Sequence, residues 1–121
     1  MNDQETPLAR LRQAMAAFVA ERGWQIYHQP RNLSMSIAIE AAELMEHFQW
    51  DAPGTDEQPD AERKEEIAAE MADILLYLCS LANRLDIDLI AAADRKLEHN
   101  RRRFPVDRVF GRAVGPLEES S

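Results

Sequence analysis

The chain has 121 residues, enough for one domain with a buried core, and 45% of them are hydrophobic. Its 14 basic and 22 acidic residues give a formal net charge of −8, which argues against a general nucleic-acid binder, because such proteins usually present a basic surface. No uninterrupted apolar run approaches the roughly 18 residues of a membrane span, so no membrane partner is expected.

The single cysteine and the N-terminus indicate the compartment. Cys79 excludes an intramolecular disulfide, which fits a reducing cytoplasm. It lies in the apolar run ILLYLCSLA, which favours a buried, inert thiol over a nucleophile. The acidic N-terminus lacks the apolar segment of a signal peptide, so a cytoplasmic location is predicted.

The first helix is predicted to begin at Thr6, as N-cap, with Pro7 at the first helical position. Apolar residues then recur at helical spacing until Gly23 ends the helix. Residues 24–31 form a connector, because Pro30 disfavours helical geometry at the residue before it. Asn32 is predicted to cap a second helix running to about Trp50.

A loop rich in proline, glycine and acidic residues follows at 51–60. The third predicted helix covers 61–85, with an apolar stripe along its length. Asp86 or Asp88 caps a fourth helix that ends at about Arg103, before Pro105. Residues 106–121 lack periodicity and are expected to be an extended or disordered tail, which leaves 1–105 as the domain.

No segment alternates like a β-strand. The chain is therefore predicted to be all-α, a bundle of four main helices. The apolar stripes look wide for a lone protomer of this size, which favours assembly into a homo-oligomer.

Acidic residues gather in the centres of the second and third helices. Glu40 and Glu43 on the second helix, and Glu70 and Asp73 on the third, form two pairs at i, i+3, so each pair shares one face. Glu46 and Glu66 bring the acidic residues there to six, and no lysine or arginine accompanies them. If the helices pack antiparallel across the loop, the two pairs face one another.

Four such carboxylates repel, by about 4 kcal/mol for each pair 4 Å apart at an effective dielectric constant near 20. Either they take up protons with raised pKa values, or a cation neutralises them. Oxygen ligands without histidine or cysteine favour Mg²⁺, with Mn²⁺ as a substitute. The alternative is that the pairs face solvent. Glu46 and Glu66 are expected either to face solvent or to support the metal ligands from behind. A di-iron bundle is disfavoured, because none of the three histidines follows a glutamate by three residues.

These motifs resemble a known family. Glu-x-x-Glu at 40–43 followed by Glu-x-x-Asp at 70–73 is similar to the signature of the all-α MazG-like nucleoside triphosphate pyrophosphohydrolases. The segments HQPRNL, FQW, DILLYL and NRRRFP resemble the dCTP pyrophosphatase branch, and the likeness spans about residues 18–105.

The resemblance implies a helical homodimer or homotetramer that cleaves a nucleoside triphosphate to the monophosphate and pyrophosphate with Mg²⁺. By motif match, Glu40, Glu43, Glu70 and Asp73 would be metal ligands. Trp24, His28, Trp50 and Tyr77 fall where relatives contact the nucleotide. Some relatives have a histidine where this chain has Met15, which leaves recognition by the first helix open.

The residue types suit that chemistry. A water attacking phosphorus needs a proton acceptor, for which Glu43 is the candidate. Trp24, Trp50 and Tyr77 either stack on the base or pack in the core. Lys96 and Asn100 share a helix face and are candidate phosphate contacts. The neighbouring arginines at 101–103 are interpreted as structural or inter-subunit.

The sequence thus predicts a Mg²⁺-dependent enzyme of nucleotide pool sanitation, with a dCTP-like substrate preferred. A relaxed enzyme acting on modified triphosphates is a variant of this hypothesis. The alternative from another class is a non-enzymatic helical oligomer whose acidic surface binds a partner.

Overall fold

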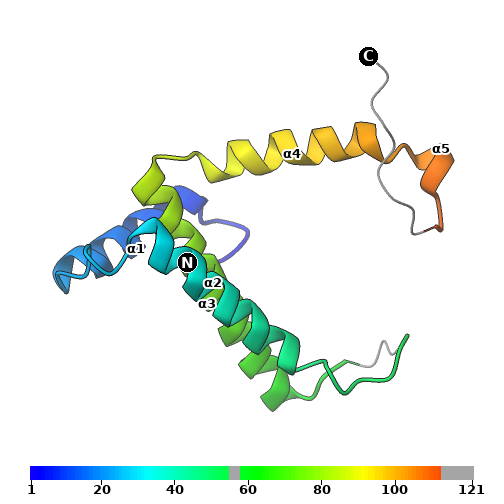
Figure 1. The fold of residues 1–121 in the computed structure, drawn as a ribbon, viewed down its shortest axis with the longest axis horizontal. Coiled ribbons are helices and arrows are strands. Elements are labelled where there is room, and N and C mark those ends of the chain that lie inside the picture. Colours follow the sequence, from blue (N-terminus) through cyan, green and yellow to red (C-terminus); the bar gives the residue numbers. More distant parts are fainter. Residues whose placement is uncertain (55–57, 113–121) are drawn as a thin grey trace. The chain divides into compact units, whose positions relative to one another are not determined.

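The computed structural model describes residues 1–54 and 58–112 and is helical throughout. Its helices are α1 (Leu8–Glu21), α2 (Pro30–Glu46), α3 (Ala61–Leu85), α4 (Leu89–Arg103) and α5 (Val106–Val109) (Figure 1). No strand occurs in the described ranges. The prediction of an all-α chain with four main helices is confirmed. None of the described helices combines the length and the apolar character needed to cross a bilayer.

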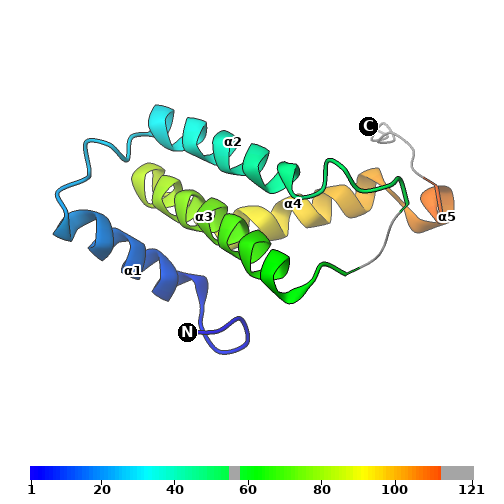
Figure 2. The ribbon, with the colours of Figure 1, turned by 90° about the horizontal axis from the view of Figure 1, so that it is seen from below.

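The chain divides into two units, the first from Met1 to Ile87 and the second from Asp88 onward. In the first unit α3 packs against both α2 and α1 (Figure 2). Met15 and Val19 of α1 and Cys79 of α3 form a buried cluster, onto which Leu8, Leu11 and Leu76 pack. Cys79 has no exposed surface, as its apolar neighbourhood predicts, and burial raises the pKa of its thiol.

Arg12 joins α1 to the end of α3. Its Nε donates to Oδ1 of Asn83 at 3.0 Å, and Nδ2 of Asn83 donates back to the Arg12 carbonyl at 3.0 Å. Its Nη1 donates to the carbonyl of Ile87 at 2.8 Å, just beyond the left-handed Asp86 that ends α3. These three hydrogen bonds fix α1 along α3, and α1 supplies one wall of the cavity described below.

Two predicted helix starts are wrong, and both lie beside a proline. Pro7 is itself the N-cap of α1, and Oγ1 of Thr6 accepts from the amide of Asn2 instead. Helix α2 begins at Pro30, two residues before Asn32. Proline lacks an amide hydrogen and has its φ angle fixed, so it suits a helix start that needs no amide donor. The sequence interpretation treated Pro30 as a barrier instead of a beginning.

The predicted bounds of α3 and the predicted end of α4 at Arg103 are confirmed, and the other boundaries include one more confirmation and two differences. Asp88 caps α4, accepting from the amide of Ala91 at 3.0 Å. Helix α2 ends at Glu46, so Trp50 lies beyond it in a turn. Residues 106–109 form the short helix α5 where an extended tail was expected, because Pro105 starts a new helical turn after breaking the old one. The rest of that tail, 113–121, lies outside the described residues.

Candidate active site

The antiparallel packing of α2 on α3 brings three of the four predicted ligands together. One carboxylate oxygen from each of Glu40, Glu43 and Glu70 lies within 4.8 Å of the others. Glu40 and Glu43 share a face of α2 because they are three residues apart, and that face meets α3 at Glu70. We call these three residues the carboxylate cluster.

Two oxygens of the carboxylate cluster are left without hydrogen-bond donors in the part of the chain that the structure describes. Oε2 of Glu40 and Oε2 of Glu70 are buried and have no partner among the described residues. The only hydrogen bond available between two carboxyl groups is a shared proton. The facing carboxyl group of Glu70, which favours the protonated form of Glu40, is the main cause that raises the pKa of Glu40, followed by burial, whereas the nearby carboxyl group of Glu43 lowers it. The negative charges of Glu70 and Asp73 raise it further.

The carboxylate cluster fits a hard divalent cation. Buried carboxylate oxygens without donors are costly, and a bound cation satisfies them directly. All three donors are oxygens, which suits Mg²⁺ or Mn²⁺ better than metals that prefer nitrogen or sulfur. Asp73, the fourth predicted ligand, is exposed and lies one turn of α3 beyond Glu70, outside the three-residue group.

Asp73 also lines a cavity of about 440 Å³ between α1 and α3. This volume lies within the range of small-molecule sites in proteins. The cavity wall is mainly apolar and aromatic, and it contains three of the predicted nucleotide contacts: Trp24, His28 and Tyr77. Its remaining lining residues are Leu11, Ala14, Met15, Phe18 and Leu76. Asp73 therefore lies on the cavity wall and acts electrostatically on the carboxylate cluster.

Trp24 owes its position to the end of α1. Gly23 adopts a left-handed φ of 63°, and the amide of Trp24 donates to the Val19 carbonyl at 3.0 Å. This is the Schellman arrangement, which turns the chain back over the last turn of the helix. The Trp24 ring then meets Phe18 edge-on, with 5.9 Å between ring centroids. The Arg22 guanidinium lies 3.7 Å from the centroid of Phe18.

His28 is held from α3. Its Nδ1 lies 2.8 Å from Oγ of Ser80, and Ser80 is only 6% exposed. The backbone amide of His28 donates to the Trp24 and Gln25 carbonyls, each at 3.2 Å. The rings of His28 and Tyr77 lie 6.4 Å apart at 38°. Backbone and side chain together therefore fix the imidazole at the cavity wall.

The remaining predicted site residues lie elsewhere. Trp50 follows α2, is 88% exposed and does not line this cavity. Lys96 and Asn100 lie one turn apart on α4, in the second unit. Their contacts with a nucleotide stay predictions. Glu46 and Glu66 are exposed, as expected for solvated residues.

Sequence reasoning missed Phe18 and Ser80. Phe18 fits the apolar stripe of α1, and nothing in the pattern separates a cavity wall from a core position. Ser80 carried a usable signal, because it is a hydroxyl in an apolar stretch and lies one turn after Tyr77, at i, i+3.

Known proteins resemble the chain in sequence and fold. The profile of the MazG-like family matches residues 35–113. The chain is 42% identical over 105 residues to dCTP pyrophosphatase 1 of Mus musculus and 45% identical over 105 residues to dCTP pyrophosphatase 1 of Bos taurus. Each match covers 84% of this chain but only 61% and 62%, respectively, of the relative's length.

A solved structure agrees. The crystal structure of a pyrophosphatase from Archaeoglobus fulgidus matches with a TM-score of 0.69 and 35% sequence identity, covering 87% of this chain and 98% of that one. The family profile spans well over half of the chain and includes the whole carboxylate cluster. This chain belongs to the MazG-like family.

Proposed function

We propose that the chain hydrolyses a nucleoside triphosphate to the monophosphate and pyrophosphate, with a dCTP-like substrate preferred and a divalent cation required. Its role would be sanitation of the nucleotide pool. The names of the curated relatives support the substrate, and the A. fulgidus structure supports the reaction class. The chain spans only about three fifths of the length of these relatives.

The observation that carries the proposal is the adjacency of two unlike surfaces. The carboxylate cluster, with two buried oxygens that have no partner in the described ranges, suits a cation, and the aromatic cavity suits a base. Asp73 belongs to the cavity wall and its charge acts on Glu40, so it links the two. A substrate with an aromatic base at one end and a polyphosphate at the other matches this arrangement.

Glu40, Glu43, Glu70 and Asp73 would hold Mg²⁺, or Mn²⁺ in its place. The bound cation would reverse the local charge for the polyphosphate and polarise the phosphoryl group as a Lewis acid. Without it, the triphosphate, which carries about four negative charges, would be repelled by the carboxylates.

Among the residues of this chain, Glu43 is proposed to accept the proton of the attacking water. Trp24 and Tyr77 would stack on or flank the base, and Trp50 would add a second stacking surface. His28, held by Ser80, would contact the nucleotide from the cavity wall. Lys96 and Asn100 would bind phosphate oxygens.

We further propose that the active protein is a homo-oligomer. Several large apolar side chains of α2 and α3 are exposed in the single chain: Met35, Ile39, Met45, Met71 and Leu75. Burying such a surface against a second copy is favourable at about 25 cal/mol per Å². Sedimentation velocity at several protein concentrations tests this; a monomer throughout would contradict it.

The test of function is pyrophosphate release from a panel of nucleoside and deoxynucleoside triphosphates, each with Mg²⁺ and with a chelator. The proposal predicts release from at least one pyrimidine deoxynucleotide, dCTP first, that depends on the metal. Metal-dependent release from modified triphosphates alone would support the relaxed variant. No metal-dependent release from any of them would favour the non-enzymatic alternative, an acidic surface that binds a partner.

A further inference from the structure

Arg63 occupies an unusual position in the first turn of α3. The N-terminal end of a helix carries a partial positive charge, so a cation there is disfavoured unless other groups compensate it. Its backbone is conventional, since its amide donates to Oδ1 of the N-cap residue Asp60 at 2.8 Å. The side chain therefore needs partners from outside its own helix.

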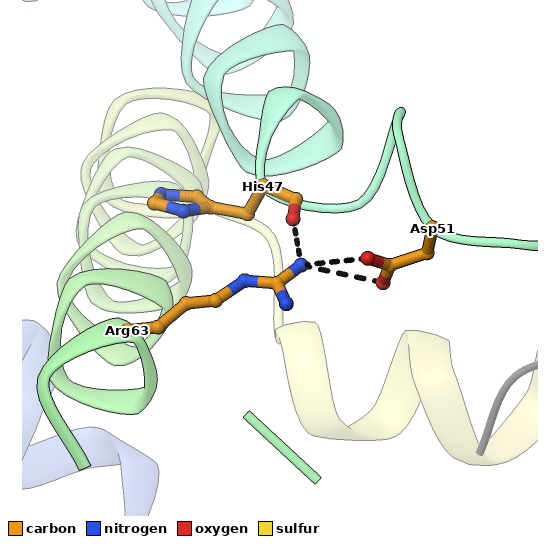
Figure 3. Close-up of polar contacts among 3 residues, drawn as sticks. All are labelled: His47, Asp51 and Arg63. Atoms are coloured by element: carbon orange, nitrogen blue, oxygen red, sulfur yellow. Dashed lines mark hydrogen bonds and ion pairs between the residues drawn. The ribbon is translucent and has the colours of Figure 1, made fainter. Parts of the chain in front are cut away.

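Those partners come from the end of α2 and the turn after it. Nη2 of Arg63 donates to the carbonyl of His47, the C-cap residue that follows α2 (Figure 3). The same nitrogen lies 3.3 and 3.4 Å from the two carboxylate oxygens of Asp51 (Figure 3). The guanidinium carbon lies 5.3 Å from the centroid of Phe48. We call this set of contacts the Arg63 clasp.

The Arg63 clasp and the carboxylate cluster share one helix register. Along α2, His47 follows Glu40 by seven residues, and along α3 Glu70 follows Arg63 by seven. Seven residues make about two helical turns, so in an antiparallel pair the His47–Arg63 contact implies that Glu40 opposes Glu70. A sliding of α2 along α3 would break the hydrogen bond and separate those carboxylates together.

The clasp also opposes a repulsion. Glu40 and Glu70 face each other without donors, and their ionised forms push α2 and α3 apart. Arg63 is half-buried, with 33% of its side chain exposed, and its bond to a helix-terminal carbonyl satisfies an acceptor that α2 leaves unpaired. The attractive contacts of Arg63 therefore lie about two helical turns from the repulsion between Glu40 and Glu70, on the same pair of helices.

We infer that Arg63 is a positioning residue for the cation site, holding α2 and α3 in the register and spacing that keep the three carboxylates together. The inference rests on the cation site of the proposed function. It predicts that loss of the guanidinium weakens cation binding although Arg63 touches no proposed ligand.

The test is Mn²⁺ binding by the full chain, followed by calorimetry or by the electron paramagnetic resonance signal of free Mn²⁺. Arg63→Met should bind Mn²⁺ about tenfold more weakly than the native protein, the scale found when residues that support metal ligands are removed. The matched control is Lys64→Met, which removes an equal charge from the neighbouring, exposed position.

The direction of the change in Mn²⁺ affinity distinguishes an effect on ligand geometry from an effect of net charge. Losing a positive charge makes the protein more negative, and this alone strengthens cation binding. Lys64→Met should therefore bind Mn²⁺ at least as tightly as the native protein. Weaker binding by Arg63→Met, with Arg63→Lys recovering most of the affinity through the donors of its ammonium group, supports the inference.

Binding by Arg63→Met as tight as that by Lys64→Met would overturn it. If circular dichroism shows that Arg63→Met does not fold, Arg63→Gln, which is neutral like Arg63→Met but supplies an amide NH₂ group as donor, is judged by the same comparison. Absence of Mn²⁺ binding by the native protein would overturn the cation site together with this role of Arg63. Equal binding by native protein and all Arg63 variants would overturn the role of Arg63 alone.

Discussion

Two contact regions between α2 and α3 differ in whether their polar groups have hydrogen-bond partners. Where Glu40 of α2 meets Glu70 of α3, two acids face each other and their buried oxygens have no donor among the described residues. About two turns away, where His47 meets Arg63, a guanidinium satisfies a carbonyl and pairs with a carboxylate. Both contact regions lie on the same two helices, so one register of α2 against α3 fixes both.

The contrast shows how a stable fold can hold carboxylates whose close approach is unfavourable by itself. Unpaired buried carboxylates destabilise the chain that carries them, so they persist only where surrounding contacts hold them and a ligand is available to neutralise them. The region around Arg63 satisfies its polar groups within the chain. The region around Glu40 does not, and its unsatisfied carboxylate oxygens make it the candidate site.

The largest expected effect comes from removing a carboxylate of the cluster. Glu70→Gln should lower kcat/KM for dCTP by at least about a hundredfold, because even residues that only support metal ligands cost ten- to a hundredfold in affinity or activity. Glu66→Gln is the control, since Glu66 lies one turn earlier on α3 and is exposed. Similar rates for both variants would contradict the assignment of Glu70.

The next effect concerns the aromatic wall. Trp24→Ala should raise KM by about 5- to 150-fold, which corresponds to the roughly 1–3 kcal/mol that stacking contributes per base. Tyr27→Ala is the control, because Tyr27 is an exposed ring in the same connector. Steady-state kinetics on dCTP measure both. An unchanged KM for Trp24→Ala would remove this ring from substrate binding.

A smaller effect is expected from Ser80→Ala. Loss of the His28–Ser80 hydrogen bond, about 1 kcal/mol, should raise KM about fivefold by letting the imidazole turn away from the cavity. Nitrogen-15 spectra of His28 should show a changed balance between its two tautomers, and Ser80→Thr should restore the native balance. A native spectrum in Ser80→Ala would show that the hydroxyl does not orient the ring.

The smallest effect is a pH dependence of stability in the metal-free protein. The folded-state pKa of Glu40 is raised, so its contribution is most favourable below the ordinary glutamate pKa and is lost as pH rises through the raised folded-state value. Glu40→Gln should therefore unfold at a higher temperature than the native protein near pH 7, with the difference shrinking toward pH 4. Thermal unfolding in chelator measures it; a difference that grows on acidification would contradict the stated sign.

Most of the fold followed from the sequence, because helix starts and stops have local causes. Gly23 ends α1 and Asp88 caps α4 as predicted. The end of α2 did not follow, since the apolar pattern of the helix continues past Glu46 to Phe48. After Glu46 the chain continues in tighter turns, with the His47 amide donating to the Leu44 carbonyl and the His47 carbonyl bound by Arg63. A partner from another helix is not visible in a local pattern.

The candidate site shows the same division. Spacing predicted that Glu40 and Glu43 share a face of α2 and that, with antiparallel packing, this face meets Glu70; the structure brings the three together. The position of Asp73 toward the cavity depends on where α1 packs on α3, which the i, i+3 spacing does not contain. Ser80 and Arg63 act on residues 52 and 16 positions away, so their roles required the three-dimensional structure.

The most direct test is a calorimetric titration of Mn²⁺ into the native protein and into the double variant Glu40→Gln/Glu70→Gln. The native protein should bind the cation, and the double variant, if folded, should lose that binding while unfolding at a higher temperature in chelator. Equal Mn²⁺ affinity in the two proteins would show that these opposed carboxylates do not form the cation site.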